Sequence, residues 1–542
     1  MPYKADKFIK VYLTHSELFG VKKARPDLER MINGVSLLGM FEALSVLSFS
    51  SKTDRSTMQA DFIAYIKSFG ENLGIEYDPQ PLLMDRILFT NQGTLATWKW
   101  LLAFGDASKI DRRIEIKRGV NLAILLQAAI ADYLYEEENE DEKLIIYEIF
   151  QNSLFNTHNN LFSMLGRTKI IMSDIARDEG LYNAGEYIDF NSDFQTHYGY
   201  TIEDYLIAIS GLISLYQSTS FSSTLTDISS VFSRTEFCDL ITEIIQPLCF
   251  SFEEGKTWAL KAMDNSWDFR LFSRKPFLRL NENLIIPVSL QYLSDQLFSS
   301  LYWKIRNCYP GNDSKFIRFF GRPFEIYLQN LLSDASNSSN IRYCLIPEFS
   351  YNNGQSRSPD AMLKLGDKLL VIEGKAKGVT EPSAIYGDPK KIETDFNRLV
   401  HDPYNQVISR LTEIQNETTT PADLQGINEF YIIVVNQLDF PHLPTFEDRV
   451  RAKITEEKRL NIKYFCHFDI EEFEQLCYLI GRPTKKQIFR ILDNHDRDYP
   501  NVNFKNFLFS AHHPVKRPEN TKDAAREFID CGLRRLFQQN EE

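Results

Sequence analysis

Three charged residues stand at the ends of two consecutive apolar runs of the chain. Asp360 precedes the first run, and Glu373 and Lys375 end the second, with twelve residues between the two acids. Because side chains alternate along a strand, Glu373 and Lys375 project to the same face. Two carboxylates can hold a hard divalent cation, which activates a bound water and polarises a phosphate. A lysine beside them can orient that water, so the set suits hydrolysis of a phosphodiester bond.

A purely structural reading of the same residues is also open. Two acids and a lysine near strand ends often form exposed salt bridges, and such a pattern arises by chance. The context favours chemistry, because the apolar run 369–372 leads directly into Glu373. A charged pair at the end of a buried strand costs free energy unless it is solvated, paired or liganded.

The surrounding sequence alternates between strand and helix patterns. Apolar runs bounded by turn formers predict strands, and apolar residues at three- and four-residue spacing predict helices. Pro323 fits the first position of a helix that contains Glu325, and Asp469 fits a helix N-cap. The predicted strands are 341–349, 360–364, 368–374, 430–435 and 462–468, the predicted helices are 323–331, 390–415 with a break before Pro403, and 469–480, and 334–340 is a predicted loop.

The motif of Pro359-Asp360 followed by Glu373-Gly374-Lys375, within this order of elements, resembles the PD-(D/E)xK nuclease superfamily. The resemblance covers about 315–480 and implies a restriction-endonuclease-like domain, in which a mixed sheet is flanked by helices. It implies that Asp360 and Glu373 bind Mg²⁺ or Mn²⁺ and that Lys375 is the catalytic lysine.

Two further residues occupy places that parts of this superfamily use. Glu325 stands where many members supply an extra acid from the first helix, which implies a third metal ligand. Gln406 resembles, with a looser match, the helical glutamine that some branches place after the core strands. Gly374 is small, which suits a backbone close to a phosphate, although glycine before lysine is also simply permissive.

The distribution of charge bears on a nucleic-acid partner. The chain carries a net charge of −13, which argues against a protein that coats nucleic acid. Residues 301–400 contain 14 Lys and Arg against 11 Asp and Glu, so the block around the motif is less repulsive to phosphate than the rest of the chain taken together. Lys377, Lys364 and Arg410 are candidate phosphate contacts, and Lys377 shares the face of Lys375 if the strand continues.

The whole chain is predicted to be an α+β multidomain protein. Helical periodicity dominates its first half, over 34–47, 122–134, 144–154 and 205–215, and a hairpin at 276–288 and a helix over 290–305 follow. The predicted organisation is a mostly helical regulatory or substrate-selecting region over 1–270, a connector over 271–314, the mixed-sheet domain over 315–480 and a helical tail over 481–542.

Several other chemistries find no support. The seven cysteines form no CxxC pair, and Cys466-His467 has no second Cys or His at a ligand spacing, so reduced thiols are expected and structural zinc is not. No GxxxxGK[ST] phosphate loop is present. The apolar windows 31–48 and 206–216 are read as buried helices, without a membrane partner, and a cytoplasmic location is the expectation.

The expected function is therefore a Mg²⁺- or Mn²⁺-dependent endonuclease that acts on DNA rather than RNA. Cutting both strands needs two sites, so a homodimer or higher homo-oligomer is expected, and the helical region could select substrate, bind a protein partner or hold the nuclease inactive. By general similarity the chain also resembles prokaryotic nucleases linked to anti-phage defence. The alternatives are an RNA-directed enzyme, an inactive nucleic-acid-binding or scaffold protein, and a helical interaction protein with the motif as surface decoration.

Overall fold

The described part of the chain divides into two compact units. Unit 1 comprises the described residues of 1–144, 198–304 and 529–542, and unit 2 those of 145–197 and 305–528. The computed structural model describes residues 12–72, 78–110, 113–134, 142–155, 160–183, 185–218, 223–311, 313–416, 422–438, 440–484 and 486–537.

This division does not follow the predicted boundaries. Residues 145–197, which were assigned to a separate helical region over 1–270, pack with 305–528 instead. The last helix, α26 (Glu519–Phe537), begins in unit 2 and ends in unit 1. Domain boundaries depend on which helix faces pack together, and helical periodicity reports only that a face is buried.

Unit 1 is built around α3 (Leu37–Phe49), in which every residue is buried. A helix that is apolar on all sides belongs in a core, and α6 (Asn91–Phe104) and α7 (Ile116–Leu134) pack on it. The predicted hairpin is confirmed as β3 (Phe277–Arg279) and β4 (Leu284–Pro287), which lie at the centre of a four-stranded sheet of order β1-β4-β3-β2.

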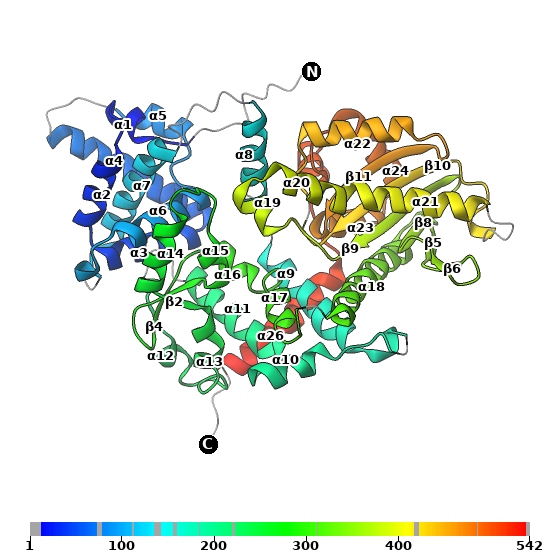
Figure 1. The fold of residues 1–542 in the computed structure, drawn as a ribbon, viewed down its shortest axis with the longest axis horizontal. Coiled ribbons are helices and arrows are strands. Elements are labelled where there is room, and N and C mark those ends of the chain that lie inside the picture. Colours follow the sequence, from blue (N-terminus) through cyan, green and yellow to red (C-terminus); the bar gives the residue numbers. More distant parts are fainter. Residues whose placement is uncertain are drawn as a thin grey trace. The chain divides into compact units, whose positions relative to one another are not determined.

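Shorter elements complete unit 1 (Figure 1). The helix predicted over 290–305 is two helices, α16 and α17. The remaining bounds are α1 His15–Phe19, α2 Arg25–Gly34, α4 Lys52–Asn72, α5 Gln80–Asp85, η2 Ala107–Lys109, α11 Ile202–Ser218, β1 Thr226–Asp227, α12 Ile228–Phe232, α13 Ile241–Ile245, η5 Gln246–Leu248, β2 Cys249–Ser251, α14 Phe252–Ala262, α15 Arg270–Arg274, α16 Leu290–Asp295 and α17 Leu301–Arg306.

A mixed five-stranded sheet forms the centre of unit 2, and its strands match the five predicted ones to within a few residues. β8 and β9 make an antiparallel hairpin, and Gly366 in its turn has a φ of 63°, a conformation that glycine adopts without strain. β9, β10 and β11 run parallel, and the order is β11-β10-β9-β8-β5. The bounds are β5 Cys344–Pro347, β8 Ala361–Leu365, β9 Lys368–Lys375, β10 Glu429–Asn436 and β11 Ile462–Asp469.

Helices cover both faces of this sheet (Figure 1). One face packs against α18 (Ser314–Ser338), α23 (Ile470–Gly481) and α24 (Ile488–Asp498). The other face packs against α20 (Pro389–Phe396) and α21 (Asp402–Asn416), whose apolar side chains form one core with those of β9 and β10. The predicted mixed sheet between helices is confirmed at this level.

Helix α18 differs from the prediction at both ends. It begins at Ser314 and continues through Pro323 to Ser338, so Pro323 is an interior residue and the loop predicted over 334–340 is mostly helical. The side chain of Asp313 accepts a hydrogen bond from the Phe316 backbone and starts the helix earlier. Proline inside a helix costs free energy because it cannot donate a backbone hydrogen bond. Burial of the aromatic side chains of the first turns offsets this cost.

Of two other local predictions, one is confirmed and one is wrong. Asp469 caps α23 in a capping box with Glu472. The break predicted before Pro403 is not present: the helix continues from α20 into α21 through a π-helical turn, η6 (Asn397–His401). The remaining elements of unit 2 are α8 Glu142–Phe155, α9 Leu161–Thr168, η3 Lys169–Ile175, η4 Glu179–Leu181, α10 Phe190–Tyr198, β6 Ser350–Tyr351, β7 Ser356–Arg357, α19 Glu381–Tyr386, η7 Ala422–Leu424, α22 Pro444–Glu456 and α25 Phe504–Ser510.

Within the described residues, no single helix is long and apolar enough to cross a bilayer. Only α2 and α3, taken together as a pair bent by 102°, have the required length and composition.

Candidate active site

Asp360 is held by its neighbours at the start of β8. Its side-chain Oδ2 accepts a hydrogen bond from the Gly374 backbone N–H at 2.6 Å, and its backbone carbonyl accepts one from Gln329 of α18 at 2.9 Å. Ser358 fixes the approach to β8, because its hydroxyl accepts from the Phe349 backbone N–H. Asp360 is therefore oriented by both the sheet and the helix beneath it.

Glu373 and Lys375 lie together at the end of β9, as the strand alternation predicts. The Lys375 ammonium donates to Glu373 Oε1 at 2.8 Å and to the side-chain oxygen of Gln406 at 3.1 Å. Arg410, one helical turn after Gln406 on α21, donates from Nη1 to both Glu373 oxygens at 2.9 and 3.1 Å. Gln406 and Arg410 are thus brought from α21 to the strand residues.

Glu325 approaches the cluster from α18. Its carboxylate pairs with Arg322, which also lies 3.6 Å from Glu348, just beyond β5. Burial raises the pKa of Glu325 above its ordinary value although Arg322 opposes the effect, and the charges of Glu348 and Glu373 add to it. Glu325 is therefore within electrostatic reach of Glu373.

Among the acids of this cluster, the charged form of Asp360 is the most destabilised by its surroundings. Its side chain is buried, and burial followed by the nearby carboxylates of Glu373 and Glu325 raises its pKa well above the ordinary value. Carboxylates that repel one another in a place shielded from water are stabilised by a cation between them. The donor set of Asp360, Glu373 and Glu325 consists only of oxygen atoms and so fits a hard ion such as Mg²⁺ or Mn²⁺.

The three carboxylates are not gathered as closely as a fully formed ion site would be. Among the described residues, donor atoms of Glu325, Asp360 and Glu373 do not all lie within 4.8 Å of one another. Lys375 and Arg410 neutralise Glu373, and Arg322 neutralises Glu325. Binding of a cation by all three would therefore require these basic side chains to give up some of their contacts.

Packing against α18 requires a glycine at position 374. A methyl group added there would lie 2.7 Å from Cδ1 of the buried Leu328 and 3.3 Å from Oδ2 of Asp360. The close approach of α18 to β9 leaves no room for a side chain at this position. The glycine thereby allows Asp360 to reach the backbone of β9.

The candidate phosphate contacts have different positions. β9 ends at Lys375, so Lys377 follows the strand; burial lowers its pKa, and the charges of Arg398 and Lys375 add to that effect. Lys364 lies towards the far end of β8 and donates to the backbone carbonyls of Asp423 and Gln425 at 2.6 and 3.0 Å. The structure brings Lys377 near the cluster and does not bring Lys364 there.

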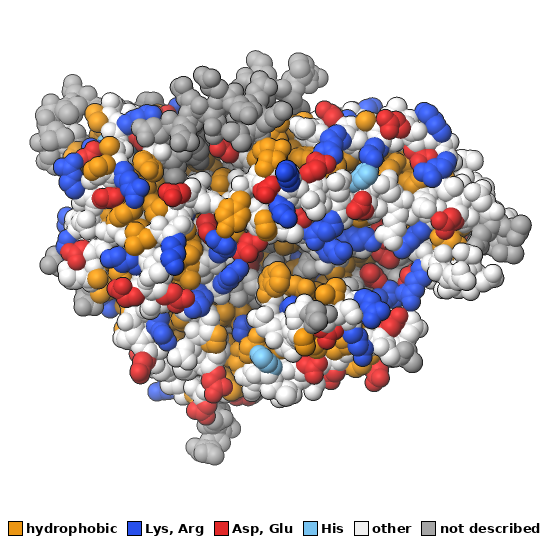
Figure 2. Space-filling view, in the orientation of Figure 1, with side chains coloured by type: hydrophobic (Ala, Val, Ile, Leu, Met, Phe, Trp, Pro, Cys, Tyr) orange, Lys and Arg blue, Asp and Glu red, His pale blue; other side chains and the backbone are white. Residues whose placement is uncertain are grey.

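Sequence reasoning missed several contributors to the cluster. Figure 2 shows Lys and Arg side chains gathered over α18 and between α18 and α21 in unit 2. Among the basic residues of α18, Arg322 reaches the acids, while Gln329 and Glu348 contribute a backbone hydrogen bond and a further charge. Arg322 and Gln329 stand three residues before and four after Glu325, so helical spacing was a usable signal for them.

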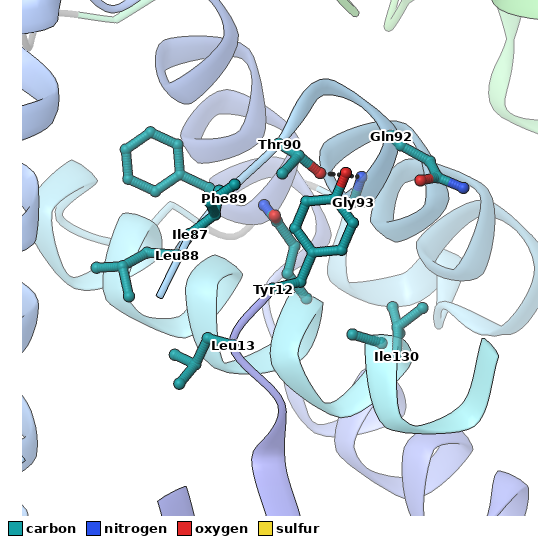
Figure 3. A pocket seen from close by; sticks show the side chains of 11 residues that line it. Tyr12, Leu13, Ile87, Leu88, Phe89, Thr90, Gln92, Gly93 and Ile130 are labelled. Atoms are coloured by element: carbon teal, nitrogen blue, oxygen red, sulfur yellow. Dashed lines mark hydrogen bonds between the residues drawn. The ribbon is translucent and has the colours of Figure 1, made fainter. Parts of the chain in front are cut away.

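A separate pocket lies in unit 1 and contains none of these residues. Figure 3 shows Tyr12, Leu13, Ile130 and the segment 87–93 around it, with the Thr90 hydroxyl accepting a hydrogen bond from the Gly93 backbone at 2.9 Å. Its lining is mainly apolar and contains no charged side chain. This pocket offers no acid–base or metal chemistry.

Comparison with known proteins adds no assignment. No family model, no curated protein and no solved structure matches the chain.

Proposed function

We propose that this protein is a metal-dependent nuclease that hydrolyses phosphodiester bonds, with DNA as the preferred substrate. One observation carries the proposal: Asp360, Glu373 and Lys375 lie together at the ends of two paired strands, and two of them are buried carboxylates. Gln406 joins them through Lys375. Exposed salt bridges would not require two acids to be buried beside each other.

Each residue has a role that its contacts support. Asp360 and Glu373, with Glu325 as a third donor, would hold Mg²⁺ or Mn²⁺, which when bound activates water and polarises the phosphate. Lys375 would donate a hydrogen bond to the attacking water or to a phosphate oxygen and so neutralise charge that develops there. Gln406 positions Lys375 by accepting one of its hydrogen bonds and Glu373 accepts a second, which leaves one ammonium proton for the reaction.

Cleavage by the full-length chain tests the proposal. We expect cutting of plasmid DNA with Mg²⁺ or Mn²⁺ and none with a chelator. Asp360→Asn and Lys375→Met should each lower the rate by about 10²- to 10³-fold, the range for loss of one group that stabilises a transition state. Asp367→Asn is the matched control, because Asp367 is exposed in the turn that joins the same two strands.

Three outcomes would overturn the substrate, the activity or the site in this proposal. Faster cutting of labelled single-stranded RNA than of DNA would make the chain an RNA-directed nuclease with the same site. Absence of cutting under every metal and substrate condition would remove the enzymatic proposal, and full activity of Asp360→Asn would remove Asp360 from the site.

The second candidate is an inactive nucleic-acid-binding protein, and the contact between Arg410 and Glu373 favours it. Arg410 holds both oxygens of Glu373, which a catalytic ion would need. In a nuclease, Arg410 would move to the substrate phosphate, so Arg410→Gln should lower kcat/KM and keep residual Mg²⁺-dependent cleavage. If the protein is inactive, Arg410→Gln should weaken nucleic-acid binding to the same extent with and without Mg²⁺, and neither the wild type nor the variant should cleave.

A further inference from the structure

A second cluster of metal-ligating side chains lies in unit 2, apart from the carboxylates of the proposed nuclease site. His467 comes from β11, Glu447 from the first turn of α22, and His442 from the irregular segment that precedes this helix. His442 Nδ1 and His467 Nε2 each lie 3.0 Å from the same oxygen of Glu447. One donor atom of each residue lies within 4.8 Å of the other two.

The three side chains of this cluster are buried, and burying such polar and charged groups costs free energy unless they are paired or bind an ion. His467 is 1% exposed, and the side chains of His442 and Glu447 are both 9% exposed. The apolar residues Phe440 and Phe446, close to His442 and Glu447 along the chain, belong to the core of unit 2. A carboxylate and two imidazoles buried beside aromatic residues need close mutual compensation.

The geometry points to a site for a borderline divalent ion of the zinc class, held by His442, Glu447 and His467. Two imidazole nitrogens and one carboxylate oxygen are a donor set that Zn²⁺ favours, whereas Mg²⁺ prefers oxygen alone. Bonds of about 2.0–2.2 Å place tetrahedral ligand atoms roughly 3.3–3.6 Å apart, a spacing close to the one present. The two rings are stacked 4.0 Å apart and nearly parallel, so they must turn for both to address one ion.

Cys466 is excluded from the ligand set. Its thiol donates to the backbone carbonyl of His467 at 3.5 Å, its side chain alternates to the opposite face of β11 from that of His467, and its sulfur is not among the donor atoms that lie within 4.8 Å of one another. Three protein ligands leave a fourth position for water or another small donor.

The second site shares a sheet face with the candidate active site. In the register of β9, β10 and β11, Glu373, Val434 and His467 lie side by side, so Glu373 and His467 project to one face with one strand between them. Two strand spacings separate them by about 10 Å. An ion here would fix the start of α22 to β11 next to the Glu373 cluster, and this inference does not depend on nuclease activity.

Metal content and binding of the full-length chain test the site. We expect about one equivalent of Zn²⁺ after purification without chelator, and for the chelator-treated chain a visible absorption spectrum of tetrahedral type on addition of Co²⁺. His442→Gln and Glu447→Gln should each weaken Zn²⁺ binding by at least about 100-fold, more than loss of an outer partner costs. Zn²⁺ should also raise the melting temperature of the wild type and not of these variants.

Matched variants separate this site from other metal binding. His197→Gln, which alters an exposed histidine of α10, and Asp360→Asn should both retain the Zn²⁺ stoichiometry and affinity of the wild type. A wild type that binds Zn²⁺ no more tightly than His442→Gln and Glu447→Gln would show an ion-free His–Glu–His cluster and overturn the site. A thiolate-to-metal absorption band in the Co²⁺ form would overturn the donor set by placing Cys466 in it.

Discussion

At the scale of single residues, the candidate active site is a set of charges that compensate one another. Glu373 has Lys375 and Arg410, and Glu325 has Arg322. Asp360 has the Gly374 backbone N–H instead of a basic side chain as its closest partner. Buried charges are tolerated when they are paired and hydrogen-bonded, so Asp360 is the group that a bound cation would stabilise most.

Gly374 offers a test of how tightly this arrangement is packed. Gly374→Ala should lower the free energy of unfolding by about 1–3 kcal/mol, because the methyl group overlaps Leu328 and crowds Asp360. Urea unfolding measures the stability, and nucleic-acid cleavage should fall with it because Asp360 is displaced. Gly34→Ala is the control, since a methyl group there meets no atom within 4 Å.

A compensating change makes this prediction specific. Leu328→Ala in the Gly374→Ala background should recover part of the lost cleavage, because it removes the atom nearest the added methyl group. If Gly374→Ala is as stable and active as the wild type, the close approach of α18 to β9 is wrong.

At the scale of elements, α24 is joined to the edge of the sheet by one buried histidine. His495 lies 2.7 Å from the Tyr464 hydroxyl of β11 through Nδ1 and 2.7 Å from the Val502 carbonyl through Nε2. These partners suit a neutral ring that donates from Nε2 and accepts at Nδ1. Burial lowers the pKa of His495 to about 4, and the charges of His442 and Arg451 add to this while Glu447 opposes it.

This histidine predicts a loss of stability in mild acid. The unfolded chain binds a proton below about pH 6.5 and the folded chain only near pH 4, so the stabilisation is complete above pH 6.5 and is lost as the pH falls between the two values. The shift corresponds to about 3 kcal/mol. Chemical denaturation between pH 4 and 7, without divalent metal, measures it.

A variant isolates the contribution of the ring. His495→Gln should be less stable than the wild type at pH 7 and show a smaller decrease towards pH 4, whereas His197→Gln should keep the wild-type dependence. An unchanged pH dependence in His495→Gln would show that other groups cause the acid sensitivity.

At the scale of the whole molecule, unit 2 is assembled from segments far apart in sequence. Arg167, which is 1% exposed, donates two hydrogen bonds to Glu474 of α23 at 2.8 and 3.1 Å and lies 3.9 Å from Glu471. The hydroxyl of Tyr327 in α18 donates to the same Glu474. Lys505 and Arg517, which lies just before α26, both pair with Glu471. This buried network fixes α9 against the helices that lie beneath the sheet.

Loss of the arginine should therefore destabilise unit 2 strongly. Arg167→Met leaves buried carboxylates without their main partner and should lower the free energy of unfolding by about 3–5 kcal/mol. Arg497→Met, which removes an exposed pair with Asp498, should cost no more than about 1 kcal/mol. Denaturant unfolding compares the two, and equal losses would mean that α9 is not part of the unit that contains α18 and α23.

The sequence by itself determined the features that depend on near neighbours. Apolar runs located the five strands of the mixed sheet, the Asp469 side chain predicted the start of α23, and strand alternation placed Glu373 beside Lys375. These features follow from backbone geometry and local hydrogen bonds, which act over a few residues. The start of α18 is an exception among these local features. Pro323 predicted the first position of a helix but lies in the interior of α18.

Only the tertiary structure decided which distant residues meet. Arg410 lies on Glu373 across 37 positions of the sequence, Arg167 on Glu474 across 307, and His467 on Glu447 across 20. Helical periodicity marks a buried face without naming its partner, and spacing rules for metal ligands hold only when the ligands share one local motif. The pairing of faces is set by packing of the whole chain, so the counter-charges of the site, the composition of the two units and the histidine cluster emerge only in three dimensions.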